Sequence, residues 1–361
     1  MRLDGFPVND FNQRLKAWYV LNHRPLPWRE THDPYKIWLS EIILQQTRVA
    51  QGMPYYEKFL LHYPTVFDLA QADERDVLRL WQGLGYYSRA RNMHYTARQV
   101  VSEFGGKFPS SAAQLGKLKG LGTYTAAAIA SFAFGEVVAA IDGNVYRVLA
   151  RLFGIRADML GNEGKKEFAA LASELVSRDD PATYNQAMIE FGALHCVPVS
   201  PKCGSCPFSD LCYAYATGTQ NELPVKVKKL KVKQRHFNYF IIEKNGLLAM
   251  KERRARDIWT GLYDFYLVET AEPVTSPDIL EDEPEVQHLL RAGMIREVPK
   301  TYFHILTHQK LNVRFWWIHI TTDADSVLPA GLAFYRESEI EMLPKPILID
   351  TVLKEEGYLP G

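Results

Sequence analysis

Leu118-Lys-Gly-Leu-Gly122 is the stretch of this 361-residue chain that decides its fold. The segments on either side of it, 111–118 and 123–134, both have helical periodicity. Two glycines around one aliphatic residue let the backbone turn sharply, and they leave amide N–H groups uncovered where the second helix begins. Gly120 and Gly122 are therefore predicted to hold an anion such as a DNA phosphate, without reading sequence. The alternative is an ordinary helical hairpin, in which Gly-x-Gly only caps a helix.

Helical periodicity extends outward from this hairpin over roughly the first 215 residues, where strand-like alternation is rare. Short turns rich in Gly, Pro and Asp separate the expected helices. These helices span 8–22, 35–50, 64–71, 73–82, 87–104, 111–118, 123–134, 145–154, 164–177 and 181–194. The pattern predicts an all-α domain over residues 1–220.

The pattern changes after a basic stretch, 221–235, which is expected to link two domains. Residues 236–243 alternate, Asn245-Gly246 predicts a hairpin turn, and 247–251 continues as a strand. Further along, 312–320 is a strong strand and 285–293 a short helix. Residues 236–361 are therefore predicted to form a separate α+β domain, which makes the protein multi-domain.

Composition bounds the class of protein. Hydrophobic residues make up 47% of the chain and the net charge is zero, although 226–235 holds six basic residues and 269–285 seven acidic ones. The basic run is either a solvated face of the linker or a phosphate contact, and the acidic run is expected to be a solvated loop. Because no apolar leader or membrane-length apolar stretch is present, a cytoplasmic protein with no membrane contact is expected, associated with the nucleoid if it is bacterial.

All four cysteines lie within seventeen residues, as Cys196-x6-Cys203-x2-Cys206-x5-Cys212. Four clustered thiolates suit an iron–sulfur cluster or a structural zinc, whereas disulfides would need an oxidising compartment. Zinc ribbons prefer two separated Cys-x2-Cys pairs, and this stretch has only one. The spacing therefore favours a [4Fe–4S] cluster.

Two carboxylates are candidates for acid–base work. Asp142 comes directly before an expected helix at 145–154, where a carboxylate is held ionised, although Asp is also a routine helix cap. Glu41 lies among apolar helical neighbours, so burial is expected to raise its pKa and make it a general acid, although structural ion pairs also bury carboxylates. If their environments give Glu41 and Asp142 different pKa values, one residue can act as an acid while the other carries negative charge. Cleavage of a glycosidic C–N bond requires both roles, a proton for the leaving base and a negative charge near the sugar.

Several long stretches resemble adenine DNA glycosylases of the MutY type, within the endonuclease-III-like helix–hairpin–helix superfamily. The likeness covers residues 24–212 in order. Its stretches are Leu26-Pro-Trp-Arg29, 34–47, 83–92, 118–125, Asp142-Gly-Asn144 and the cysteine loop 196–212. The resemblance implies removal of adenine that is paired with 8-oxoguanine or guanine in double-stranded DNA, by a monomeric enzyme of base excision repair.

The resemblance also implies roles for individual residues. Glu41 matches the acid that protonates adenine N7, Asp142 the carboxylate that stabilises the sugar cation, and Asn144 its support. Tyr124 stands where lyases of the superfamily carry a Schiff-base lysine, so no strand cleavage is expected. The flipped adenine and the vacated base stack would be contacted by Arg24, Leu26, Trp28, Arg29, Leu44, Gln46, Thr47, Tyr86, Gln186, Ile189 and Glu190.

The C-terminal domain resembles a MutT-like (Nudix) fold around Trp259-Thr-Gly-Leu-Tyr-Asp-Phe265. Where the hydrolase helix should carry an acidic metal cluster, the chain has 286–293, so pyrophosphate hydrolysis is not expected. In the family this domain recognises 8-oxoguanine with a Phe-Ser-His loop. Leu306-Thr307-His308 is the match here, and leucine lacks the stacking ring.

Two other functions remain open from the sequence. A pyrimidine-directed glycosylase with lyase activity is disfavoured by Tyr124 and by the C-terminal domain. A non-catalytic iron–sulfur protein that binds mismatched DNA is disfavoured by the intact pair Glu41 and Asp142. Protein partners in replication or mismatch repair are not readable from these residues.

Overall fold

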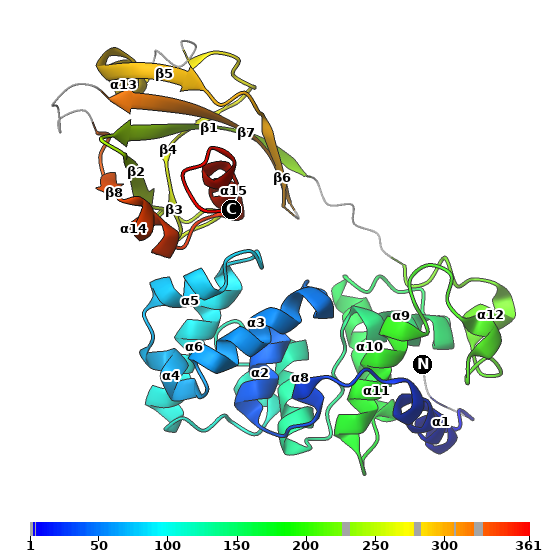
Figure 1. The fold of residues 1–361 in the computed structure, drawn as a ribbon. Coiled ribbons are helices and arrows are strands. Elements are labelled where there is room, and N and C mark those ends of the chain that lie inside the picture. Colours follow the sequence, from blue (N-terminus) through cyan, green and yellow to red (C-terminus); the bar gives the residue numbers. More distant parts are fainter. Residues whose placement is uncertain (1–2, 4, 226–231, 278–282, 307, 321–327) are drawn as a thin grey trace. The chain divides into compact units, whose positions relative to one another are not determined.

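The computed structural model describes residues 3, 5–225, 232–277, 283–306, 308–320 and 328–361. The chain divides into two compact units, Met1–Gln71 with Asn92–Lys228 and Ala72–Arg91 with Lys229–Gly361. The first unit is helical and the second is built on a β-sheet (Figure 1). The expected domain boundaries at 220 and 235 stay a prediction. Residues 226–231 of the expected linker lie outside the described residues, and 233–235 begin the first strand.

Helices account for the regular structure of the first unit, as the sequence predicted. In chain order they are α1 (Val8–Asn22), η1 (Pro27–Arg29), α2 (Pro34–Ile43), α3 (Val49–His62), α4 (Val66–Gln71), α7 (Ala112–Leu115), α8 (Thr123–Phe134), α9 (Gly143–Phe153), α10 (Asn162–Leu175), α11 (Pro181–Leu194), η2 (Cys203–Ser205) and α12 (Tyr213–Thr217). The helix α6 (Ser88–Phe104) begins in the second unit and continues into the first, and α5 (Glu74–Leu80) belongs to the second.

The expected single helix over 35–50 is wrong. The helix α2 ends at Ile43, and a tight turn separates it from α3, which the sequence reading did not predict. The turn contains Gln46 with φ of 54°, a left-handed conformation that a non-glycine residue rarely adopts. This break matters for function because the turn forms part of the rim of the pocket described below.

The residues at both ends of α9 explain where this helix begins and ends. Asp142 caps its N-terminus, and Gly154 ends it with φ of 68°. A Cβ at Gly154 would lie 2.5 Å from the ring of Tyr213, so only glycine satisfies both the conformation and the space. On the inner face, Leu149 is fully buried against Phe168 and Phe191, which fixes α9 against α10 and α11.

The second unit holds a mixed sheet of eight strands (Figure 1). Five of them follow the order β3-β2-β1-β7-β5, while β4 pairs with β1, β6 with β7 and β8 with β2. The strands are β1 (Lys233–Lys244), β2 (Leu247–Glu252), β3 (Tyr263–Asp264), β4 (Tyr266–Thr270), β5 (Gly293–Glu297), β6 (Tyr302–Ile305), β7 (Gln309–Ile320) and β8 (Ala333–Tyr335). Among the described strands, β1 and β7 pair in parallel and the other pairs are antiparallel. The helices α13 (Pro284–Ala292), α14 (Glu337–Met342) and α15 (Ile347–Glu355) complete the unit.

The predicted hairpin turn is confirmed, with positive φ at both Asn245 and Gly246 between β1 and β2. The strand predicted over 312–320 lies within β7, and the helix predicted over 285–293 corresponds to α13. The core of the unit lies between sheet and helix, where Phe240 and Trp316 are buried with Val286 and Leu289 of α13. This part is the predicted α+β fold.

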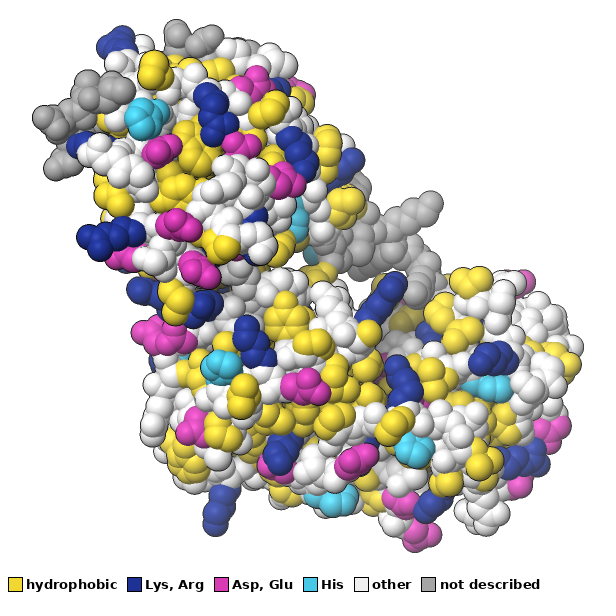
Figure 2. Space-filling model, viewed as in Figure 1, with side chains coloured by type: hydrophobic (Ala, Val, Ile, Leu, Met, Phe, Trp, Pro, Cys, Tyr) yellow, Lys and Arg dark blue, Asp and Glu magenta, His cyan; other side chains and the backbone are white. Residues whose placement is uncertain are grey.

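Charges of both signs are interspersed over the visible faces in Figure 2, in keeping with the net charge of zero. Attraction of a charged ligand would therefore depend on local groups rather than on the net charge of the chain. Among the described residues, no helix is long and apolar enough to cross a membrane.

Candidate active site

A cavity of about 870 Å³ opens in the helical unit. Its walls come from η1, α2, the turn 44–48, α8, the start of α9 and α11. Of the predicted site residues, the lining includes Arg24, Leu26, Trp28, Arg29, Glu41, Leu44, Gln46, Thr47, Tyr124, Asp142, Asn144, Gln186 and Ile189. Residues that lie far apart in the sequence are thus brought together around one space large enough for a nucleobase.

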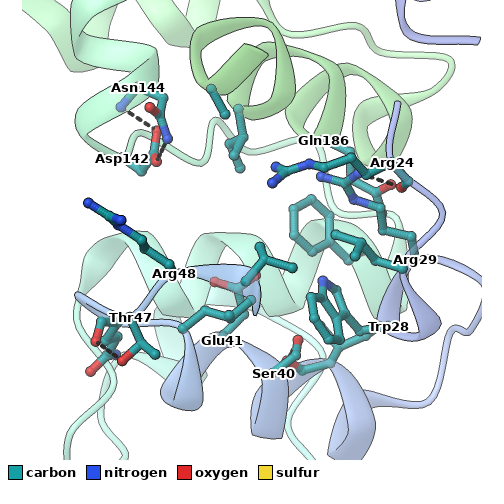
Figure 3. A pocket seen from close by; sticks show the side chains of 18 of the residues that line it. Arg24, Trp28, Arg29, Ser40, Glu41, Thr47, Arg48, Asp142, Asn144 and Gln186 are labelled. Carbon is teal, nitrogen blue, oxygen red and sulfur yellow. Dashed lines mark hydrogen bonds between the residues drawn. The ribbon is translucent and has the colours of Figure 1, made fainter. Parts of the chain in front are cut away.

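Glu41 projects from α2 into this cavity (Figure 3). Burial raises the pKa of its carboxyl to about 7 and outweighs the hydrogen bond from the Tyr124 hydroxyl, which acts in the opposite direction. The nearby charge of Asp142 raises it further. Glu41 can therefore carry a proton near neutral pH and donate it, which is what a general acid must do.

Asp142 lies across the cavity from Glu41 at the start of α9 (Figure 3). Its carboxylate accepts the backbone N–H groups of Asn144 and Val145 at 2.9 and 2.8 Å, and the Asn144 side-chain amide at 2.6 Å. Burial raises the pKa of Asp142, while these three donors favour the charged form. Burial thus raises the pKa of both carboxyls, and the predicted separation of the two pKa values stays a prediction.

Asn144 is itself held by Arg147, one turn further along α9. The Nη2 atom of Arg147 donates to Asn144 Oδ1 at 2.8 Å and to the carbonyl of Gly192 at 2.7 Å. Its Nε donates to the carbonyl of Cys196 at 2.8 Å. A side chain at Gly192 could not fit, because a Cβ there would lie 2.7 Å from Asn144 Cβ. One buried arginine thus connects the carboxylate of the cavity to the start of the cysteine loop.

The substitution Arg147→Gln should slow release of the base while leaving DNA binding largely unchanged. Loss of the bond to Asn144 frees the amide that orients Asp142, and small misplacements of a reacting group cost roughly ten- to a hundredfold in rate. Single-turnover kinetics and a binding titration on the same duplex would separate the two quantities. As a control, Arg156→Gln removes an exposed arginine paired with Glu222 and should behave as wild type. An unaltered rate of base release in Arg147→Gln would contradict the inference that Arg147 orients Asp142 through Asn144.

Tyr124, the second residue of α8, lies where its hydroxyl donates to Glu41. Burial and the two nearby carboxylates raise the pKa of Tyr124 well above its usual value. The side chain is therefore a neutral phenol that can orient Glu41. A phenol has no amine with which to form a Schiff base.

Glu190 does not line the cavity, contrary to its predicted place in the pocket, and lies fully buried behind the wall. It accepts the backbone N–H of Arg24, the Arg24 guanidinium at 2.8 and 2.6 Å, and the Arg29 guanidinium at 3.0 and 2.7 Å. Burial alone would raise the pKa of Glu190, but these bonds outweigh it and lower the pKa to about 2. Glu190 is thus a permanent anion that holds two arginines. Both of these arginines border the cavity (Figure 3).

The remaining wall combines an apolar surface with one amide. Leu26 and Trp28 are buried, and the Trp28 ring packs edge-on against Tyr56. Gln186 accepts a hydrogen bond from the Tyr19 hydroxyl at 2.7 Å, which fixes its side-chain amide. A flat, partly polar ligand such as a purine matches this combination of surfaces.

The two predicted wedge residues share an unusual backbone. Gln46 has φ of 54° and Tyr86 has φ of 47°, and both side chains are exposed. Such conformations cost free energy and concentrate at functional sites. Gln46 borders the cavity, whereas Tyr86 belongs to the other compact unit and does not line it.

At the predicted anion site the backbone makes a turn that leads into α8. Gly120 has φ of 81°, and a Cβ there would lie 2.8 Å from Asn92 Cβ, so the turn requires glycine at this position. The helix α8 then begins at Thr123, with Gly122 as its cap and no side chain hydrogen-bonded to the first turn. Uncapped N–H groups at a helix start are suited to a phosphate.

The four cysteines surround a second, small cavity. All four are partly buried, and no disulfide joins them. Burial raises the pKa of Cys206 to about 12 and also raises that of Cys212. Among the described residues, no three Cys, His, Asp or Glu side chains are arranged to hold a single metal ion. Four thiols around one space form a donor set that could hold a metal centre.

In the second unit, the predicted recognition loop joins β6 to β7. Leu306 and Gln309 exchange backbone hydrogen bonds, and the carbonyl of exposed His308 accepts the N–H of Lys233. Thr307 lies outside the described residues. Phe303 and Ile305, on β6 just before this loop, are exposed to 63% and 75%. Apolar surface is thus present beside the loop, although Leu306 lacks an aromatic ring.

Sequence reasoning missed three residues that the site uses. Arg147 lies three residues after Asn144, and the helical spacing could have indicated that the two share a face. Tyr19 looks like an ordinary core residue of α1, and nothing in the pattern shows that its hydroxyl reaches Gln186. Arg48 borders the cavity beside Thr47 (Figure 3), but the unpredicted turn before α3 concealed its place.

Comparison with known proteins agrees with this geometry. Residues 39–178 match the HhH-GPD superfamily of base excision DNA repair proteins, and 196–212 match the iron–sulfur binding domain of endonuclease III. Residues 238–355 match the NUDIX domain. An adenine DNA glycosylase of Buchnera aphidicola subsp. Baizongia pistaciae is 36% identical over 261 residues, which are 71% of this chain and 73% of that protein.

The chain belongs to the adenine DNA glycosylase family. The rat adenine DNA glycosylase is 43% identical over 225 residues, and the Arabidopsis thaliana one is 37% identical over 293. These matches cover 60% and 70% of this chain but only 44% and 46% of those proteins. The chain thus spans less than half the length of these two family members.

Solved structures match part of the chain. A thermostable thymine-DNA glycosylase has a TM-score of 0.55 and 30% identity, and the match covers 60% of this chain and all of that one. A non-covalent endonuclease III–DNA complex has a TM-score of 0.50 at 22% identity, which shows the shared fold. The predicted fold class is confirmed, and the family match supports an iron–sulfur cluster at the four cysteines.

Proposed function

We propose that this protein is a monofunctional glycosylase that removes adenine paired with 8-oxoguanine or guanine in double-stranded DNA. The observation that carries the proposal is the pair of carboxyls that face each other across a base-sized cavity. Glu41 has a pKa of about 7 and can donate a proton. Asp142, held by three N–H donors, can carry negative charge beside a sugar.

The reaction begins with a nucleotide rotated out of the duplex, since a stacked base gives no access to N7 or C1′. The adenine ring lies against Trp28, and Arg24, Arg29 and Gln186 supply polar contacts at its edge. Glu41 then protonates N7, which weakens the bond between the base and the sugar. Asp142 stabilises the positive charge that develops on the sugar as this bond breaks.

Water completes the reaction at C1′. Once Glu41 has given its proton to the base, its carboxylate can accept a proton from the attacking water. The Tyr124 hydroxyl keeps this carboxyl oriented through both steps. Because Tyr124 offers no amine, the product is an abasic site in an unbroken strand.

The proposal is tested with duplexes that carry adenine opposite 8-oxoguanine, adenine opposite guanine, or thymine opposite guanine. Adenine should be released from the first two, fastest opposite 8-oxoguanine, and strand breaks should appear only after alkali treatment. Breaks without alkali, with a covalent complex trapped by borohydride, would instead establish a lyase. Release of thymine alone would assign the cavity to a pyrimidine.

We further propose that the cluster is of the [4Fe–4S] type. Support comes from the 6-2-5 cysteine spacing and from the cavity that the four cysteines share. Purified protein should hold about four irons and as many acid-labile sulfides per chain. About two of each would indicate a [2Fe–2S] centre instead.

Recognition of 8-oxoguanine is proposed to involve the loop at His308. The substitution His308→Ala removes an exposed ring that makes no side-chain hydrogen bond among the described residues, so folding should be unaffected. The ratio of release rates opposite 8-oxoguanine and opposite guanine should fall several-fold, by the roughly 1 kcal/mol of one lost hydrogen bond. His288→Ala, on the exposed side of α13, serves as the control. An unchanged ratio in His308→Ala would place recognition elsewhere.

A further inference from the structure

One buried cation beside the cysteine cavity has no role in the chemistry described above. Arg151, on α9 one turn after Arg147, is only 3% exposed. Its side chain lines the small cavity together with the four cysteines. Nη1 of Arg151 lies 3.4 Å from the Sγ atom of Cys196.

The other donors of Arg151 all meet neutral groups. Nε donates to the carbonyls of Gln220 and Leu223 at 2.9 and 3.1 Å. Nη1 donates to the carbonyl of Val197 at 2.7 Å, and Nη2 to that of Pro198 at 3.0 Å. Within the described part of the chain, the guanidinium forms no ion pair with a carboxylate.

A buried guanidinium without an anionic partner is costly, because transfer of a charge out of water is repaid only by pairing. The backbone carbonyls accept the hydrogen bonds that the Arg151 guanidinium can donate, but they supply no net negative charge to balance its positive charge. Four cysteine thiolates around an iron–sulfur core would supply it, since they carry more negative charge than the core neutralises. Within this set of ligands, the Sγ atom of Cys196 accepts a hydrogen bond from Arg151, so the negative charge of that thiolate lies directly beside the guanidinium.

We propose that Arg151 is the counter-cation of the iron–sulfur cluster and sets its reduction potential through the hydrogen bond to Cys196 Sγ. A positive charge next to the cluster favours the more reduced state, and hydrogen bonds to cluster sulfurs act in the same direction. The inference rests on the cluster at these cysteines and is independent of which base the enzyme removes.

Two substitutions at Arg151 distinguish the effect of its positive charge from the effect of its size and shape. Arg151→Lys keeps the positive charge but cannot reach all the carbonyls, whereas Arg151→Met fills similar space without charge. Iron content and the midpoint potential of the holoprotein on a DNA-modified electrode are the readouts. Arg156→Met, at an exposed arginine just after the end of α9, is the matched control.

Arg151→Met should lose part of its iron, and the remaining cluster should have a more negative potential. Arg151→Lys should retain iron and a potential closer to wild type, and Arg156→Met should match wild type in both. Wild-type iron content and potential in Arg151→Met would overturn the proposal. Equal loss of the cluster in both Arg151 variants would also overturn it, because shape and hydrogen bonding would then matter rather than charge.

A measurement on the unaltered protein avoids any folding defect. Wild-type holoprotein with ¹⁵N-labelled arginine guanidinium groups can be brought to a paramagnetic state of the cluster and studied by electron–nuclear double resonance. A ¹⁵N coupling is expected from the nitrogen that bonds to Cys196 Sγ, and it should disappear in Arg151→Lys. Absence of any ¹⁵N coupling in the wild type would refute the hydrogen bond and with it the proposal.

Discussion

Asp142→Asn is expected to abolish adenine release while binding to the mispair persists. Asparagine is as good a helix cap as aspartate, so its side-chain oxygen can still accept the N–H groups of Asn144 and Val145. The substitution therefore removes the negative charge together with the one oxygen that accepts from the Asn144 side-chain amide. Loss of a charge directed at a transition state costs about 3 kcal/mol or more, which is at least roughly a hundredfold in rate. Single-turnover kinetics and an equilibrium binding titration measure the two effects.

A matched control exists elsewhere in the chain. Asp73 caps α5 by accepting the N–H of Arg75, and it is exposed and outside the cavity. Asp73→Asn makes the same chemical change at the same kind of helix position, so it should retain wild-type release. Turnover by Asp142→Asn at the rate of this control would show that Asp142 does not stabilise the sugar.

Glu41→Gln should likewise abolish release, since an amide cannot protonate the base, yet it should stabilise the protein at about pH 8. The folded-state pKa of Glu41 is about 7, above the ordinary value of about 4.3. The folded protein therefore binds more protons than the unfolded chain in this interval, and stability falls as pH rises through it. Glutamine removes the penalty of a buried charge, for a gain on the order of 1–3 kcal/mol.

Thermal unfolding of wild type and Glu41→Gln at about pH 5 and about pH 8 measures this gain, which should be larger at the higher pH. Glu57→Gln, on the exposed side of α3, is the control and should change neither activity nor stability. The release rate of the wild type should also decline as pH rises through about 7, where Glu41 loses its proton. A rate that increases over that range would mean that Glu41 acts first as a base.

The sequence predicted which residues line the cavity better than it predicted how those residues are supported. Glu41, Asp142 and Tyr124 could be recognised because their motifs are local and specific. The position of Glu190 could not, because its burial depends on α11 packing beside two arginines from a distant segment. The turn at Gln46 was missed because the residues around it have helical periodicity, while tertiary structure holds a left-handed residue there.

The supporting arginines show the same limit. Arg147 and Arg151 look like polar positions of an amphipathic helix, yet both are buried. Arg147 donates to the carbonyl of Gly192, and Arg151 donates to that of Val197 in the cysteine loop. Such contacts join segments that lie far apart in the sequence, so no local sequence pattern predicts them. Tertiary packing determines which arginine side chains are buried.

The central claim is that Glu41 and Asp142 together release a flipped adenine. It is tested most directly by chromatographic detection of free adenine under single-turnover conditions, with a duplex that carries adenine opposite 8-oxoguanine. The wild type should release one adenine for each duplex bound and leave the strand intact until alkali is added, and Glu41→Gln should release none while binding the same duplex. Tight binding by the wild type without any free adenine would contradict the claim and identify a protein that only binds mismatched DNA.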